Sequence, residues 1–90
     1  MRSFALRYTG EAKTRIRHLH PLLKQEVRLA LEELQDDPYL GKPLQREFIG
    51  LRSLRVRNYR IIYKMDESKW RIDILTLGPR RVIYQDLIKK

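Results

Sequence analysis

The amino-acid sequence predicts one α+β domain spanning residues 1–90, in which an antiparallel sheet packs against two helices. Three observations lead to this class. Apolar and polar residues alternate with period two near the start, apolar residues recur at spacings of three and four over residues 9–36, and period two returns after residue 50. Alternation is typical of half-buried strands, and the longer spacing is typical of helices with one apolar face. A chain of 90 residues is long enough to bury one modest core.

The first elements are a strand and two helices. The strand is predicted over residues 2–8, where three large apolar side chains fall on one side. Thr9 then occupies the N-cap position of a short helix. Pro21 interrupts that helix and suits the first turn of a second one, which ends at residues 36–38. We therefore expect two antiparallel helices joined by a tight corner.

The second half is predicted to be mainly strand. Residues 38–50 contain two prolines and two glycines among charged residues, so they are expected to form a mobile surface connection. Residues 66–69 are a predicted turn, and Gly78 with Pro79 ends the last strand. Residues 80–90 are expected to form a short helix or an irregular tail. The three strands of this antiparallel meander are predicted over residues 53–57, 59–64 and 72–77.

Positive charge is concentrated in the second half. The formal net charge is +9, and residues 51–90 carry 11 basic and 4 acidic side chains, against 9 and 7 in residues 1–50. Such a field favours a polyanionic partner, either nucleic acid, an anionic membrane or an acidic protein. No apolar run approaches the ~20 residues that span a bilayer, and no helix has a wholly basic face, so membrane binding is not expected. The chain has no cysteine and no apolar block in residues 1–10, so we expect a cytoplasmic protein without disulfides.

The clearest functional signal is a run of arginines. Residues 52–60 contain four arginines, a tyrosine and no acid. If Arg57 and Asn58 form a two-residue turn, Arg55 faces Arg60 across the strand pair, on the surface away from the helices. Like charges directly opposite each other cost a few tenths to about 1 kcal/mol. The pair therefore favours a phosphate ligand that planar guanidinium groups bind bidentately. The alternative is that each arginine covers a tyrosine or pairs with Glu47, Asp73 or Asp86.

The same site is predicted to extend into the C-terminal segment. Arg80 and Arg81 follow a strand that should lie beside residues 59–64. Tyr84 comes four residues after Arg80, so one helical turn would direct its hydroxyl toward the same place.

Two segments resemble a known family. Residues 54–63 (LRVRNYRIIY) and 78–84 (GPRRVIY) resemble the LRVGDYRIIY and GHRRxxVY motifs of the RelE/ParE superfamily, toxins of bacterial and archaeal toxin–antitoxin systems. Residues 41–44 (GKPL) also resemble the family's segment before the hairpin, and the order of elements matches across nearly the whole chain. The resemblance implies a RelE-like α+β fold and, in the RelE branch, metal-independent cleavage of mRNA, commonly in the ribosomal A site.

The resemblance also implies roles for individual residues. The 2′-hydroxyl attacks the adjacent phosphate, so the site needs a base, cationic stabilisation and an acid for the leaving oxygen. Arg60 and Arg80 match arginines that hold the scissile phosphate, and Tyr84 matches a tyrosine that stacks on or orients the nucleotide. Further RNA-binding residues are predicted from the hairpin, the next strand and the tail: Arg52, Arg55, Arg57, Lys64 and Arg81.

Two positions depart from the family pattern. Ser53 stands where many members have lysine or arginine, and Pro79 stands where many have histidine. A proton-transfer residue is thus missing from an expected place. Glu47 is the candidate replacement base, because some members use a glutamate just before the hairpin; the alternative is a solvated loop glutamate.

The other chemically notable residues are assigned ordinary roles. His18 and His20 lie on the first helix and its corner, where we expect solvent exposure or capping. Phe48 and Trp70 are expected to be packing residues. No cluster of histidines or carboxylates has ligand spacing, so neither a metal nor another cofactor is predicted.

Three functions and one partner follow from the resemblance and the charge. The favoured function is a RelE-like endoribonuclease toxin that acts on mRNA, on the ribosome, and so inhibits translation. The alternatives are a ParE-like toxin that inhibits DNA gyrase, and a basic RNA-binding module without catalysis. The exposed cationic surface also predicts a cognate acidic antitoxin, which would bury the arginines or displace the tail from Arg80 onward.

Overall fold

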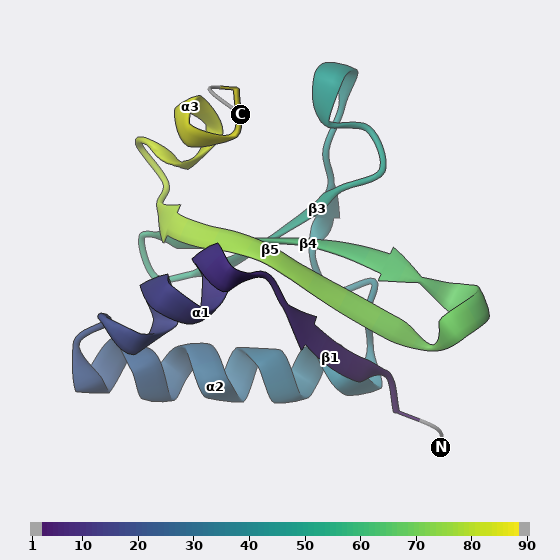
Figure 1. Cartoon of the computed structure of the whole chain (residues 1–90), viewed down its shortest axis with the longest axis horizontal. Coiled ribbons are helices and arrows are strands. Elements are labelled where there is room, and N and C mark those ends of the chain that lie inside the picture. Colours follow the sequence, from purple (N-terminus) through teal and green to yellow (C-terminus); the bar gives the residue numbers. More distant parts are fainter. Residues whose placement is uncertain (1–2, 89–90) are drawn as a thin grey trace.

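The chain folds as a five-stranded sheet with two helices on one face and a third on the other (Figure 1). This description rests on a computed structural model that describes residues 3–88; the predicted first strand and C-terminal tail extend into residues 1–2 and 89–90, outside the described part. The strand order is β1-β5-β4-β3-β2. The elements are β1 (Ala5–Tyr8), α1 (Gly10–Arg17), α2 (Pro21–Asp36), β2 (Lys42–Pro43), η1 (Arg46–Phe48), β3 (Arg52–Val56), β4 (Tyr59–Asp66), η2 (Glu67–Lys69), β5 (Arg71–Pro79) and α3 (Ile83–Ile88).

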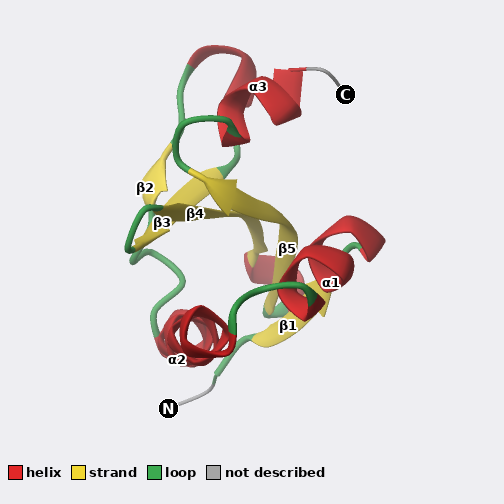
Figure 2. Ribbon diagram, turned by 90° about the vertical axis from the view of Figure 1, so that its left-hand side faces the viewer, coloured by secondary structure: helices red, strands yellow, loops and turns green. Residues whose placement is uncertain are grey.

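The two predicted helices are confirmed, together with their caps. Thr9 is the N-cap of α1, where its hydroxyl accepts a hydrogen bond from the Ala12 amide. The same hydroxyl donates to the Leu75 carbonyl, which attaches the start of α1 to β5. Pro21 is the first residue of α2, where its missing N–H costs nothing. Figure 2 shows α1 and α2 together on one side of the sheet, with α3 on the other.

The hydrophobic core lies between the sheet and α1 and α2. Both helices contribute their apolar face, and β3, β4 and β5 contribute alternate residues, as strand geometry requires. The buried core residues are Ala12, Val27, Leu31, Leu34, Val56, Ile61, Tyr63, Ile72, Ile74 and Leu77.

The predicted hairpin is confirmed residue by residue. β3 and β4 pair antiparallel with Arg55 opposite Arg60, and the turn comprises Arg57 and Asn58. Arg57, rather than Asn58, has the positive φ, at 56°. This residue is held there by its partners, because its guanidinium donates two hydrogen bonds to the Glu26 carboxylate on α2. The meander β3-β4-β5 is also confirmed.

Two features of the sheet were not predicted. β1 pairs with β5 in parallel orientation, at one edge of the sheet. Residues 38–50 are not a featureless connection, because Lys42 and Pro43 form β2 against β3 and residues 46–48 form η1. Leu44 and Leu51 are joined by a backbone hydrogen bond of 2.9 Å, which closes the η1 loop at its base.

Tyr63 fixes the path from α2 to β2. Its ring is completely buried, and its hydroxyl donates to the Pro38 carbonyl at 2.7 Å and accepts from the Gly41 amide at 2.9 Å. A Cβ atom at Gly41 would lie 2.8 Å from the Tyr63 ring and 2.9 Å from the Ser53 carbonyl oxygen, closer than real contacts allow. Within residues 3–88, no helix is long and apolar enough to cross a membrane.

We predict that Gly41→Ala lowers the free energy of unfolding by about 1–3 kcal/mol, because the added methyl group forces Tyr63 or the β3 backbone to move. Urea denaturation measures this change. Gly10→Ala is the matched control, because nothing lies within 4 Å of a Cβ at Gly10. Equal stability of the two variants would show that the packing at Gly41 is not restrictive.

Candidate functional site

The candidate site lies on the outer face of the sheet, defined as the face opposite α1 and α2. Cross-strand pairing in β3, β4 and β5 sets two neighbouring rows of side chains on this face. One row comprises Arg55, Arg60 and Gly78, and the next comprises Ser53, Ile62 and Thr76. The predicted pair of arginines therefore stands side by side across the β3-β4 ladder.

Arg60 has an unused hydrogen-bond donor in the middle of this face. Its Nε is buried and has no hydrogen-bond partner among the side chains and backbone groups that the structure describes. Thr76, in the next row, has a buried hydroxyl that also lacks a partner there. Arg55 is more exposed, and its Nε donates to the Arg57 carbonyl at 2.9 Å. Neither Arg55 nor Arg60 forms an ion pair with a described carboxylate, so a phosphate would meet uncompensated positive charge.

The segment after β5 returns over the outer face as α3. The Arg80 amide donates to the Asn58 carbonyl at 2.7 Å, which holds the start of this segment beside the hairpin turn. Ile83 is fully buried, and a Cβ at Gly78 would lie 3.1 Å from its Cδ1. The Tyr84 hydroxyl contacts the Ser53 hydroxyl at 3.3 Å. Tyr84 is thus positioned next to the arginine row, as predicted.

The η1 loop rises from the sheet on the same face as α3 (Figure 1). Phe48 was predicted to be a packing residue, and it packs on an aromatic ring outside the hydrophobic core. Its ring contacts Tyr84, with centroids 6.0 Å apart and planes tilted by 39°. Glu47, the candidate base, is exposed on the same loop. Tyr84 therefore contacts both Phe48 on η1 and Ser53 on β3, although it lies more than 30 residues after them in the sequence.

Three predicted RNA-binding residues do not join this group. Arg52 donates to the Gly41 and Tyr39 carbonyls and lies over the Tyr39 ring, on the helix side. Arg57 is paired with Glu26, and its hydrogen bonds lower the pKa of that carboxyl. Lys64 lies on the outer face but two residues beyond Ile62, away from Arg60. Arg80 and Arg81 have exposed side chains near the hairpin turn.

The histidines and Trp70 have the ordinary roles that were expected. His20 caps α2, because its side chain accepts from the Leu22 amide, and His18 contacts the Thr14 carbonyl at 2.8 Å. Trp70 packs on Phe4, with ring centroids 5.0 Å apart. Among residues 3–88, no three His, Asp or Glu side chains are grouped where they could hold a metal ion.

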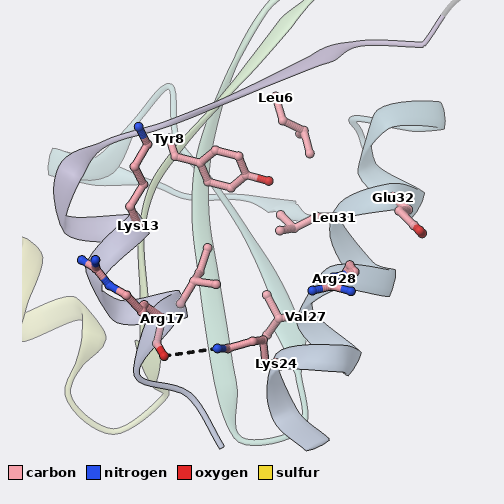
Figure 3. A pocket seen from close by; sticks show the side chains of 10 residues that line it. Leu6, Tyr8, Lys13, Arg17, Lys24, Val27, Arg28, Leu31 and Glu32 are labelled. Carbon is pink, nitrogen blue, oxygen red and sulfur yellow. Dashed lines mark hydrogen bonds between the residues drawn. The ribbon is translucent and has the colours of Figure 1, made fainter. Parts of the chain in front are cut away.

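A separate groove lies on the helix side of the molecule, between β1, α1 and α2 (Figure 3). Its volume is about 450 Å³, and its floor is apolar, formed by Leu6, Tyr8, Ile16, Val27 and Leu31. Its rim is mainly basic and consists of Lys13, Arg17, Lys24 and Arg28, with Glu32 as the one acid. The Lys24 ammonium donates to the Arg17 carbonyl at 3.2 Å across this rim. This surface is suited to an amphipathic segment rather than to phosphate chemistry.

Comparison with known proteins identifies the class to which this fold and site belong. The family described as "ParE toxin of type II toxin-antitoxin system, parDE" matches residues 6–84. Toxin RelG of Mycobacterium tuberculosis is 33% identical over 84 residues, covering 91% of this chain and 97% of that protein. The crystal structure of the toxin–antitoxin complex RelBE2 from M. tuberculosis matches with a TM-score of 0.80 and 32% identity, covering 89% of this chain and 94% of that one. The isolated Escherichia coli RelE toxin has the same fold, with a TM-score of 0.76, 19% identity and 97% coverage of both chains.

These matches define a toxin of a type II toxin–antitoxin system. The chain belongs to the ParE toxin family, within the RelE/ParE superfamily, as its hairpin and tail motifs indicated.

We predict that Ile83→Ala releases α3 from the outer face, because Ile83 is its completely buried anchor. Hydrogen exchange of the amides in residues 83–88 should speed up by about tenfold or more, as expected for local opening. Val82→Ala is the matched control, because Val82 is 42% exposed. Unchanged exchange in the Ile83 variant would mean that α3 is held by other contacts.

Proposed function

We propose that this toxin is an endoribonuclease that cleaves mRNA and so inhibits translation. The observation that carries the proposal is the uncompensated arginine pair on the outer face, with the buried, unpartnered Arg60 Nε, one row away from Ser53, which contacts the Tyr84 hydroxyl. Planar guanidinium groups beside an aromatic ring suit a single-stranded nucleotide, since the ring binds the base and the cations bind the phosphate. The relatives named RelG and RelE support the same branch of the superfamily.

The proposed chemistry is attack of the 2′-hydroxyl on the adjacent phosphate, which forms a 2′,3′-cyclic phosphate as the bond from phosphorus to the 5′ oxygen breaks, with water supplying the proton that the leaving oxygen takes up. Arg60 would stabilise the charge that develops on the phosphorane, because its position is fixed by the central strand β4. Arg80 would bind the same phosphate from the neighbouring segment, while Tyr84 would orient the nucleotide. Glu47 would accept the 2′-hydroxyl proton from the η1 loop. Translating mRNA in the cytoplasm is the proposed substrate, and Arg55 and Arg81 would bind its flanking phosphates.

One alternative is a ParE-like toxin that acts on DNA gyrase. The description of the matching family favours it, because that description names the ParE branch. The free arginine row favours RNA, since a protein target would not need uncompensated guanidinium groups clustered beside an aromatic ring. The two functions differ in what stops first in cells, protein synthesis or DNA replication.

We predict that Arg60→Ala lowers the rate of mRNA cleavage about 10²- to 10³-fold, as expected for loss of one transition-state donor. Primer extension on translated messages measures new 5′ ends. Arg28→Ala is the matched control, because it removes an exposed arginine from α2, across the sheet from the site. The proposal fails if an Arg60→Ala, Arg80→Ala double variant cleaves mRNA normally at equal protein level, or if expression blocks replication while protein synthesis continues.

We also propose that the cognate antitoxin binds this toxin through both charged surfaces. The solved relatives include complexes of RelE toxins with RelB antitoxins, such as those of M. tuberculosis and E. coli. An acidic segment would neutralise the outer face, and the apolar groove with its basic rim complements an amphipathic segment flanked by acids.

Co-expression with the product of the adjacent reading frame should abolish growth inhibition and yield a heteromeric complex. We predict that Lys13→Glu with Arg28→Glu weakens this complex by about fivefold or more, because two cations of the groove rim are reversed. Calorimetry of the purified proteins measures the affinity. Lys69→Glu is the control, because it reverses an exposed charge on η2, away from the groove. Equal affinities would exclude the groove rim from the interface.

A further inference from the structure

We propose that Phe48 and Tyr84 are the two walls of a slot that binds one unpaired RNA base, so that Phe48 is a substrate-binding residue of this toxin. This inference rests on the proposed function and adds a base-binding subsite to the phosphate-binding arginines. It begins from the finding that Phe48 lies outside the core and has the Tyr84 ring as its aromatic partner.

The η1 loop holds Phe48 by its own backbone rather than by core packing. Its neighbour Ile49 is 76% exposed, and Glu47 is exposed too, so the loop buries little apolar surface. Hydrogen bonds within residues 44–51 close the loop. Arg46 at its start has a φ of 58°, a conformation that residues with a side chain rarely adopt. Strain of this kind persists where the surrounding structure fixes a functional conformation.

Tyr84 is held in place from the opposite side. Its hydroxyl contacts Ser53, and the preceding residue Ile83 is buried against the sheet. The two rings therefore come from separate segments, a loop and a short helix, that meet above the outer face. Neither ring belongs to the core between the sheet and α1 and α2, so the rings can separate without disturbing that core.

The slot has the right position for the base of a nucleotide bound at Arg60. Ser53, which contacts Tyr84, is two residues from Arg55 on β3, and Arg55 is directly opposite Arg60. Two residues of a strand span about 7 Å. This separation is comparable to that between the base and the phosphate of one nucleotide. A base in the slot would thus place its phosphate at the arginine pair.

The rings must open slightly to admit a base. Their centroids are 6.0 Å apart, whereas a base between two rings needs about 7–8 Å, the sum of two van der Waals contacts. Because the ring planes are tilted by 39°, one ring must also rotate so that a base can stack on both. Stacking depends on the π-face that every base presents, so this slot would select an unpaired base without reading its sequence strongly.

The test measures base stacking directly and does not require cleavage. The probe is a short oligoribonucleotide with 2′-deoxyribose at the scissile position and 2-aminopurine, a base whose fluorescence falls on stacking. Titration with the purified chain gives both the affinity and the quenching. We expect Phe48→Ala and Phe48→Leu to lower the affinity about 5- to 100-fold and to remove the quenching. Phe48→Tyr should stay within about threefold of the unaltered chain, because an aromatic wall remains.

The matched control is Ile49→Ala, the next residue on the same loop, which should bind the probe like the unaltered chain. Phe48→Leu keeps an apolar contact for Tyr84, so its failure to bind identifies stacking rather than packing. The slot is overturned if Phe48→Ala or Phe48→Leu binds and quenches within twofold of the unaltered chain. If quenching depends on Phe48 but the chain cleaves no RNA, the slot is supported and the nuclease activity is rejected. If Arg60→Ala abolishes cleavage but Phe48→Ala has no effect on binding or quenching, the nuclease activity is supported and the slot is rejected.

Discussion

The two hydrogen bonds of the Tyr63 hydroxyl are the contacts on which both sides of the molecule depend. Its ring lies in the middle of the core, and burial raises its pKa, so the phenol stays neutral and able to donate. By bonding to the chain at Pro38 and Gly41, it determines where the chain leaves α2 and joins the sheet as β2. The η1 loop follows directly, so the position of Phe48 and Glu47 above the outer face depends on a hydrogen bond made below it.

The sheet separates two different kinds of surface. On the helix side, the arginines of the hairpin have internal partners, as Arg52 has in the carbonyls after α2 and Arg57 has in Glu26. On the outer side, Arg55 and Arg60 have no carboxylate partner among the described residues. Four arginines close in sequence thus divide into two that stabilise the fold and two available to a ligand. Strand alternation separates Arg52 from Arg55, whereas Arg57 lies in the turn, beyond the end of β3, and pairs with Glu26 on α2.

The parts of the structure predicted from sequence are those governed by local rules. Alternation and turn chemistry gave the register of Arg55 with Arg60, and capping rules gave the start of α1 at Thr9 and of α2 at Pro21. The missed features depend on contacts between distant segments. Ion pairing of an arginine was the stated alternative, but no local pattern relates Glu26 to Arg57, 31 residues away, so this partner could not be foreseen.

The partner of Phe48 depends in the same way on a distant segment. An aromatic residue in a short loop is usually a packing residue, and only the return of α3 over the outer face brings Tyr84 to it. Ser53 shows a related effect, because its contact with Tyr84 also spans 31 residues. Its position in the sequence revealed only a departure from the family motif, whereas the structure gives it a partner.

The parallel pairing of β1 with β5 has a consequence for how the chain folds during its synthesis. β1 pairs with β5, and the hydrogen bond from Thr9 to Leu75 joins residues 66 positions apart. β1 therefore cannot join the sheet until β5 has been synthesised. Arg80 and Tyr84 come later still. A nascent chain therefore has neither a closed sheet nor a complete candidate site until its final elements emerge.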